Sequence, residues 1–223
     1  MSRLADDVVR RLHSAIVAGD LPPGDRLTES QLCATYDVSR VPVREALKQL
    51  EGEGFVESRA YAGVRVATMN ADEAVDLFAV RKTIESATVK RCALRFRRTP
   101  DHPDVEVFGK GLEGLVATGC GAADSADRSE LPPLNTEFHL SLAEFGGHTS
   151  MLSLLRQVSA KIEWLYAMDV DVRGQHSWEE HRAIADAVRC GDVAGARRLM
   201  RRHIDNSLEG YLLRHTERRG EQG

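Results

Sequence analysis

Three cationic side chains recur at intervals of four residues in the segment 40–51. Arg40, Arg44 and Lys48 lie on one side of this segment if it is helical. Apolar residues repeat within it at the i, i+3, i+4, i+7 spacing of a buried stripe, namely Val43, Ala46, Leu47 and Leu50. Arginine suits bidentate contact with guanine edges or with phosphate. The cationic face therefore indicates contact with DNA, and the alternative is an ordinary solvated helix face.

Three histidines lie within apolar helical patterns that are far apart in the chain: His139, His181 and His203. A lone histidine in such a position is usually a hydrogen-bonded core residue. Three neutral imidazoles that met in one apolar site would lack acceptors, whereas a divalent ion would satisfy all three. The sequence thus leaves two interpretations open, a metal site and a set of core histidines.

The residues before the cationic segment predict the first elements of a winged helix-turn-helix. Apolar residues from Leu4 to Val17 have helical spacing, and a loop rich in glycine and proline ends this helix. Thr28 and Gln31 form the capping box of a short second helix, and Ser39 is a natural N-cap for the third.

A short β-hairpin is expected after the third helix. The runs 55–58 and 64–67 contain β-prone residues and meet around Gly63. A glycine there lets the backbone of such a wing approach a minor-groove phosphate closely. Residues 1–70 therefore predict a winged helix-turn-helix DNA-binding domain.

From residue 71 onward, apolar residues repeat only with helical periods, so residues 71–216 predict an all-helical bundle. Small and polar residues over 118–133 predict a loop within it, and the tail 217–223 is expected to fray. Later helices are expected over 134–145, 150–168, 178–189 and 193–213. The predicted fold class is mainly α, a winged helix-turn-helix followed by this bundle.

The charge balance fits a DNA-contacting surface that is local rather than general. The chain has 223 residues and a formal net charge of −4, and residues 1–70 hold nine Lys or Arg against ten Asp or Glu. Coating nucleic acid nonspecifically requires the neutralisation of many phosphates, so this charge argues against that class of protein.

The sequence predicts neither a membrane span nor a disulfide framework. No apolar run approaches the roughly 20 residues that cross a bilayer, and acidic residues occupy the start, where a signal peptide would be apolar. The four cysteines are far apart, without a C-x-x-C pair. We therefore expect a cytoplasmic protein with reduced thiols and no membrane partner.

The run "GDLPPGDRLTESQLCATYDVSRVPVREALKQLEGEGFVE" closely resembles the N-terminal domain of GntR-family bacterial transcription regulators. The hallmark of this family is L-x-E-x-x-L followed by V-S-R-x-P-V-R-E-A-L. The resemblance implies DNA contacts from Ser39, Arg40, Arg44 and, in the wing, Gly63. Some relatives have a further arginine where this chain has Ser30, which implies fewer or different contacts here.

The rest of the chain, to about residue 213, resembles the FadR-type subfamily and its helical effector-binding and dimerisation domain, known as FCD. The runs that carry this resemblance are "AVRKTIESATVKRCA", "NTEFHLSLAEFGGH" and "EEHRAIADAVRCGDVAGARRLMRRHI". It implies a divalent metal ion, zinc or nickel, held by His139, His181 and His203. Many FCD domains add an Asp four residues before the first histidine, where this chain has Asn135. An amide oxygen can coordinate, but its missing charge should weaken the binding of a dication.

Arg81 matches an arginine that faces the effector in relatives, which implies a carboxylate ligand. The alternative is an i, i+4 salt bridge between Arg81 and Glu85. A basic run near the C-terminus, from Ala196 to Arg219, is interpreted as a solvated helix face over a bundle core.

We expect a transcription regulator that binds a two-fold double-stranded DNA operator as a homodimer and senses a small carboxylate in its helical domain. One alternative is a metal-dependent enzyme that activates water at a three-histidine site. Its general base would have to be Glu137 or Glu180, and Glu180 is turned by about 100° from His181 on a helix. The other alternative is a DNA-binding protein with an inert dimerisation domain.

Overall fold

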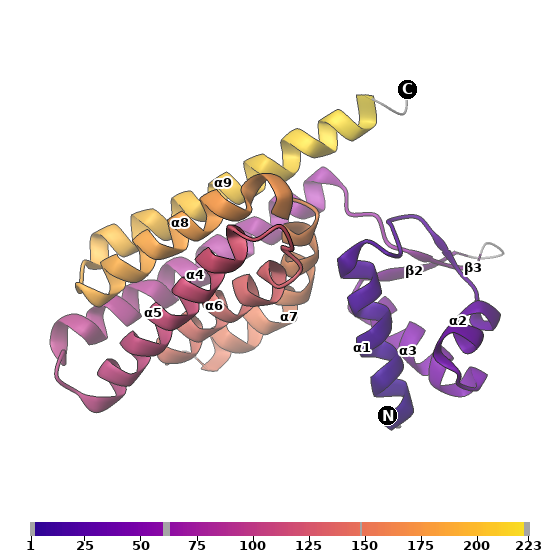
Figure 1. Cartoon of the computed structure of the whole chain (residues 1–223), viewed down its shortest axis with the longest axis horizontal. Coiled ribbons are helices and arrows are strands. Elements are labelled where there is room, and N and C mark those ends of the chain that lie inside the picture. Colours follow the sequence, from indigo (N-terminus) through magenta and orange to yellow (C-terminus); the bar gives the residue numbers. More distant parts are fainter. Residues whose placement is uncertain (1–2, 60–62, 148, 221–223) are drawn as a thin grey trace. The chain divides into compact units, whose positions relative to one another are not determined.

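The computed structural model describes residues 3–59, 63–147 and 149–220, and it divides the chain into two compact units, Met1–Met69 and Asn70–Gly223 (Figure 1). Over the described residues it has nine helices and three short strands. The prediction of a mainly α fold, with a winged helix-turn-helix followed by a helical domain, is confirmed.

The N-terminal unit consists of three helices and a small antiparallel sheet. Its elements are α1 (Arg3–Ala18), β1 (Arg26–Leu27), α2 (Glu29–Tyr36), α3 (Arg40–Gly52), β2 (Val56–Arg59) and β3 (Gly63–Val66). The strand order is β1-β3-β2, with Val56 opposite Val66 and Leu27 opposite Val64. The strand β1 is absent from the sequence prediction because two residues are too few to show a period of two. The hairpin turn lies at residues 60–62, outside the described residues.

One apolar core positions α3 in this unit. The stripe of α3 is fully or almost fully buried, and it packs with α1 residues that have the same character: Ala5, Val8, Leu12 and Ile16. Phe55 and Val66 extend the core to the hairpin. Burying four or five such side chains contributes roughly 1.5–3 kcal/mol each, so the orientation of α3 is fixed by its apolar face. The opposite face is left to solvent.

The second unit is a bundle of six helices, which lie side by side in Figure 1. They are α4 (Ala71–Arg98), α5 (Pro103–Ala123), α6 (Leu131–Phe145), α7 (Thr149–Ala167), α8 (Val170–Arg189) and α9 (Val193–Gly220). Asn70 and Glu73 form a complete capping box, which starts α4 where the helical periods begin in the sequence. The longest helices, α4 and α9, pack along each other, and α8 packs against both α9 and α5.

The predicted loop over 118–133 is wrong at both ends, because α5 continues to Ala123 and α6 begins at Leu131. The small residues reflect close packing instead of a turn. Gly119 faces Trp178, and a Cβ at that position would overlap the indole ring. Glycine is thus used here for the approach of two helices.

Two further boundaries differ from the prediction. The helix α8 begins at Val170 rather than near Trp178, so it includes His176. The last helix runs to Gly220, so residues 217–220 of the expected frayed tail are helical, and residues 221–223 lie outside the described residues. No helix within the described ranges combines the length and the apolar character that crossing a bilayer would require.

Candidate functional site

The cationic face of α3 is exposed as its spacing predicts. Arg40, Arg44 and Lys48 are all exposed, while the apolar stripe on the other side of the helix is buried. The helix is therefore divided into a face that holds it on the domain and a face with three cations at solvent. An α-helix with its side chains fits into the major groove of B-DNA.

Arg44 has an acidic partner from the neighbouring helix. Its Nε lies 2.7 Å from Oε1 of Glu29, the first residue of α2. This hydrogen bond holds the pKa of Glu29 below its usual range. The Arg44 side chain remains 65% exposed, so the ion pair orients the guanidinium without burying it. An exposed pair of this kind contributes little to stability, and a phosphate or base edge can replace Glu29 as the partner.

Ser39 occupies the N-cap position of α3, but its hydroxyl makes no capping hydrogen bond. The hydroxyl is exposed at the helix N-terminus, where backbone N–H groups are free to bind an anion. The neighbouring helix α2 is capped differently, since the Thr28 hydroxyl accepts a hydrogen bond from the Gln31 backbone N–H at 3.3 Å. Gln31 Oε1 accepts from that hydroxyl rather than from the Thr28 backbone, so the capping box is half formed.

Gly63 is the first residue of β3, and its φ of 80° lies in the left-handed region that favours glycine. The guanidinium of Arg26 lies beside it, because a Cβ at Gly63 would be 3.7 Å from Arg26 Nε. Arg26 is exposed and belongs to β1. The sequence prediction overlooks it because β1 is too short to be recognised. Its place in the sheet next to the wing makes it a further candidate for a phosphate contact.

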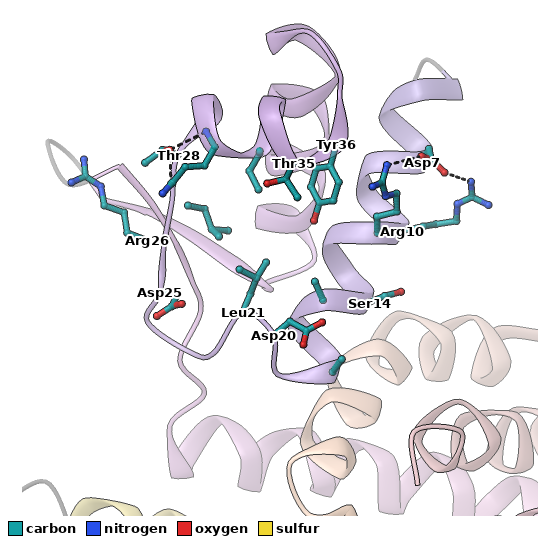
Figure 2. Close-up of a pocket in the computed structure, with 16 residues that line it drawn as sticks. Asp7, Arg10, Ser14, Asp20, Leu21, Asp25, Arg26, Thr28, Thr35 and Tyr36 are labelled. Carbon is teal, nitrogen blue, oxygen red and sulfur yellow. Dashed lines mark hydrogen bonds and ion pairs between the residues drawn. The ribbon is translucent and has the colours of Figure 1, made fainter. Parts of the chain in front are cut away.

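A groove on another face of the same unit is formed by α1, the following loop, β1 and α2 (Figure 2). Figure 2 shows Arg10 and Asp7 of α1 as an ion pair, with Tyr36 and Thr35 of α2 across from them. The Arg11 guanidinium lies 4.6 Å from the centre of the Tyr36 ring. None of the α3 cations lines this groove, so it is separate from the predicted DNA-contacting face.

The three histidines from α6, α8 and α9 meet inside the helical unit. His139, His181 and His203 are each 4% exposed or less, and one ring nitrogen from each lies within 4.8 Å of the others. Nε2 of His181 and Nε2 of His203 are 3.3 Å apart. Phe138 and Trp178 pack on the His181 ring, with ring centres 4.2 and 4.7 Å away. The cluster is therefore polar at its centre and apolar around it.

Two carboxylates contact the outer sides of this cluster. Glu180 Oε2 lies 2.8 Å from Nδ1 of His203, and Glu85 pairs with Nδ1 of His139. The hydrogen bond to Glu180 places the ring proton of His203 on Nδ1 and leaves its Nε2 as a lone pair that faces His181. Histidine ligands of metals are commonly oriented by such partners. The sequence prediction assigns no such role to Glu85 or Glu180.

Burial keeps the histidines neutral. It lowers the pKa of His139 and of His181 well below the usual value, because a buried imidazolium loses its hydration. Burial also lowers the pKa of His203, although the hydrogen bond to Glu180 opposes it. Burial raises the pKa of Glu85, and the Arg81 guanidinium opposes that change. Neutral imidazoles are the form that binds a metal, so no proton has to leave first.

The donor set fits a divalent cation. His139 Nε2 and His181 Nδ1 have no hydrogen-bond partner among the described residues, although both are buried. Asn135 is 1% exposed and lies one turn before His139 on α6, and its Nδ2 is also without a partner in the described part of the chain. Unsatisfied buried groups cost about 1–3 kcal/mol each. A cation among the imidazoles would take up the lone pair of His139 Nε2, and the Asn135 oxygen would be an additional neutral ligand.

Arg81 is buried beside this cluster and makes the ion pair that the sequence offers as its alternative role. Its Nε lies 2.6 Å from Oε1 of Glu85, and the side chain is 3% exposed. Its Nη2 has no hydrogen-bond partner within the described residues. The guanidinium therefore donates from Nε to Glu85, and the N–H groups of Nη2 remain for another acceptor.

Comparison with known proteins gives matches over both units. Residues 4–66 match the family model for bacterial regulatory proteins of the gntR family, and residues 76–206 match the model for the FCD domain. The Nta operon transcriptional regulator of Aminobacter aminovorans is 30% identical over 191 residues, which cover 84% of this chain and 86% of that protein. The HTH-type transcriptional repressor GlaR of Escherichia coli (strain K12) is 28% identical over 205 residues, which cover 89% of this chain and 91% of that protein.

A solved structure has the same fold. E. coli McbR/YncC superposes with a TM-score of 0.77 over 96% of this chain and 100% of that one, at 18% sequence identity.

Proposed function

This chain belongs to the gntR family of bacterial regulatory proteins and carries an FCD domain, and we propose that it binds a two-fold operator as a homodimer under the control of a small effector. It is a transcriptional regulator and not an enzyme, since its family and its relatives are regulators. The alternative of a metal-dependent hydrolytic enzyme is therefore set aside.

The observation that carries the proposal is the division of α3 into two faces. Its buried stripe fixes the helix on the domain, and its exposed face has Arg40, Arg44 and Lys48 in one row. In the proposed complex this row enters the major groove. Ser39 contributes its hydroxyl and the helix N-terminus to a phosphate, and Gly63 lets the wing approach the backbone.

The proposed homodimer rests on the small DNA-contacting surface of a single winged helix-turn-helix domain. A single recognition helix with a short wing contacts few base pairs, and specific affinity usually requires two half-sites about 10 base pairs apart. The operator should then have two-fold symmetry like the dimer. The helical domain is the part proposed to hold the two copies together.

The histidine cluster is proposed as the metal site, with His139, His181, His203 and the Asn135 oxygen as its ligands. The buried unsatisfied nitrogens and the two carboxylates behind His139 and His203 support it. Zinc and nickel suit this donor set, because imidazole nitrogen is a preferred ligand of both. When bound, the ion supplies a positive centre in the helical domain.

The effector is proposed to be a small carboxylate. Arg81 reaches the cluster from α4 with a free Nη2 donor, and a carboxylate could accept from Arg81 while its other oxygen approaches the cation. The pair with Glu85 fixes the guanidinium in this orientation. Binding would act on DNA affinity if it stabilises one placement of the two winged domains over another.

In vitro selection tests this proposal with the full chain and a random duplex library. We expect an enriched motif with two inverted half-sites about one helical turn apart. Titration of that duplex should give one dimer per site by light scattering. A motif without symmetry, or a monomer on the DNA, would contradict the two-fold mode. A panel of hydroxy acids and dicarboxylates, added to the complex, then tests the class of effector.

A further inference from the structure

A groove with one sign of charge runs between α4 and α9 on the surface of the helical unit. It has a volume of about 390 Å³. Lys82 and Lys90 line it from α4, and Arg197 and Arg201 line it from α9. Arg198 and Arg202 line the adjacent hollow on α9. The chain as a whole has a formal net charge of −4, so this concentration of cations is local.

Most of these cations lack an acidic partner. Lys82 pairs with Asp205 of α9. No carboxylate within the described ranges lies at ion-pair distance from Lys90, Arg197 or Arg201. Like charges one turn apart on a helix destabilise it by a few tenths of a kcal/mol. The cations of the groove therefore repel one another, and a bound anion would offset this repulsion.

Ser86 adds a second and independent observation. It lines the groove between the two lysines of α4 and is 7% exposed. Its hydroxyl oxygen is buried and has no hydrogen-bond partner among the described residues. Helical serines usually donate to the carbonyl four residues earlier, as Thr83 in the same helix does to Ala79. An unused donor at the base of a cationic groove indicates an acceptor that comes from a ligand.

The groove in the N-terminal unit provides a contrast within the same molecule. Its lining mixes three acidic with three basic side chains, Asp7, Asp20, Asp25, Arg10, Arg11 and Arg26. Such a lining favours neither anionic nor cationic ligands. The α4–α9 groove contains four cations and no carboxylate.

We propose that the α4–α9 groove binds a small molecule with two or more phosphate groups. Guanidinium and ammonium groups on both walls, with a hydroxyl donor between them, match the acceptor-rich surface of phosphate. This site is separate from the histidine cluster and does not depend on the function proposed for it. Ser86 follows Glu85 in sequence but is turned by about 100° from it on α4, toward the surface groove.

The spacing of the cations favours a chain of phosphates over a single one. Arg197 and Arg201 are four residues apart, about 6 Å along α9, and Lys82 and Lys90 are eight residues apart, about 12 Å along α4. One phosphate could not contact all four. The short length and concave shape of the groove suit a small ligand rather than the continuous backbone of a duplex.

Calorimetric titration of the full chain with sodium tripolyphosphate, at a fixed ionic strength of about 0.15 M, tests the site. Orthophosphate and sulfate are the single-anion comparisons. The variant R197Q/R201Q removes the two cations that α9 contributes to the groove. R98Q/R156Q is the matched control, because both arginines are exposed on the same unit but outside the groove. Asp205→Asn removes the acidic partner of Lys82.

We expect tripolyphosphate to bind the wild type, and R197Q/R201Q to weaken it by about tenfold or more. The control should bind like the wild type, and Asp205→Asn should bind more tightly. Ser86→Ala should weaken binding several-fold without lowering the melting temperature of the free chain, since its hydroxyl has no partner to lose.

Equal weakening by both double variants would indicate diffuse attraction and overturn the proposal. Orthophosphate binding as tightly as tripolyphosphate would overturn the phosphate-chain assignment. If tripolyphosphate fails to bind but R197Q/R201Q weakens binding to random-sequence duplex, the groove is a nucleic-acid surface and the proposal is wrong.

Discussion

The exposed face of α3 and the buried histidine cluster hold nitrogen-rich side chains in opposite surroundings. On α3 the cations are exposed to solvent, and Arg44 makes an exposed ion pair with Glu29. In the cluster the imidazoles are stripped of water, neutral, and partly without hydrogen-bond partners. The first group keeps its charge and can exchange partners easily. The second group is neutral and gains most from a cation.

Mutations in the two regions should therefore change different properties of the protein. Removing an exposed cation should change what the surface binds while the fold keeps its stability, since surface substitutions usually cost within about 0.5 kcal/mol. Changes in the cluster should alter stability and metal binding together, because a ligand bound only by the folded state stabilises that state. The two regions should therefore respond to mutation in separable ways.

The largest effect is expected for the double variant R40A/R44A. Each arginine lost from a base or phosphate contact should cost about 1–3 kcal/mol of DNA binding, so the pair should weaken operator binding by about a hundredfold or more. Fluorescence anisotropy on the selected operator at fixed salt measures this. Thermal unfolding should be nearly unchanged. R98A/R156A, which removes two exposed arginines from the helical unit, serves as the control.

Glu180→Gln should weaken metal binding by about ten- to a hundredfold, the usual effect of losing a partner behind a histidine ligand. The Glu180 carboxylate accepts hydrogen bonds from His203, Asn206 and Arg173. Burial alone would raise the pKa of Glu180, but these partners outweigh it and hold the pKa below its usual value. Glu179→Gln is the matched control, because Glu179 is adjacent but exposed. Competition with a chromogenic chelator measures the affinity. Equal loss in both variants would show that the Glu180–His203 contact is irrelevant to the metal.

Gly119→Ala should destabilise the helical unit by about 1–3 kcal/mol, because the added methyl group overlaps the Trp178 ring. Trp178 supports the His181 ring, so metal affinity should fall as well. Gly121→Ala, two residues further along α5, meets no atom within 4 Å and should be neutral or slightly stabilising. Chemical denaturation of both variants provides the comparison. A harmless Gly119→Ala would mean that α5 and α8 are not in close contact there.

A further prediction concerns the pH dependence of the metal-free fold. The folded pKa values of His139, His181 and His203 lie below the unfolded value of about 6.5. The unfolded chain therefore binds more protons in this window, and stability falls as pH drops below about 6.5. Each group adds up to about 1.4 kcal/mol per pH unit. Urea unfolding between pH 7 and pH 5 should show a shallower slope in His139→Gln. Replacing the exposed His176 should leave the slope unchanged.

Much of the N-terminal unit follows from local sequence. The stripe of α3, the cap at Thr28 and the loop after α1 all indicate the same boundaries, and the structure agrees with them. What local patterns miss are features set by other elements. The strand β1 exists because Leu27 pairs with Val64. Gly119 and Gly174 lie inside helices, and glycine is needed there because side chains of Trp178 and Leu131 occupy the space beside them.

The candidate site shows the same limit. Burial of the three histidines is predictable from their registers, and the structure brings their rings together. The carboxylates behind them are not predictable, since Glu180 is turned away from His181 on α8 and instead meets His203 of α9. A residue that faces away from one ligand on its own helix can thus support another ligand across the helix pair. Only the packing of α8 on α9 reveals this.

Thermal unfolding of the wild type and of Asn135→Asp, after chelator treatment and again with added zinc or nickel, is the most direct test of the metal site. If the cluster holds a dication, metal should raise the melting temperature of both chains. The rise should be larger for Asn135→Asp, whose carboxylate adds a charged ligand beside His139. If the histidines are only core residues, a buried carboxylate without a cation is costly. Asn135→Asp would then melt below the wild type in both conditions, and that result would contradict the metal site.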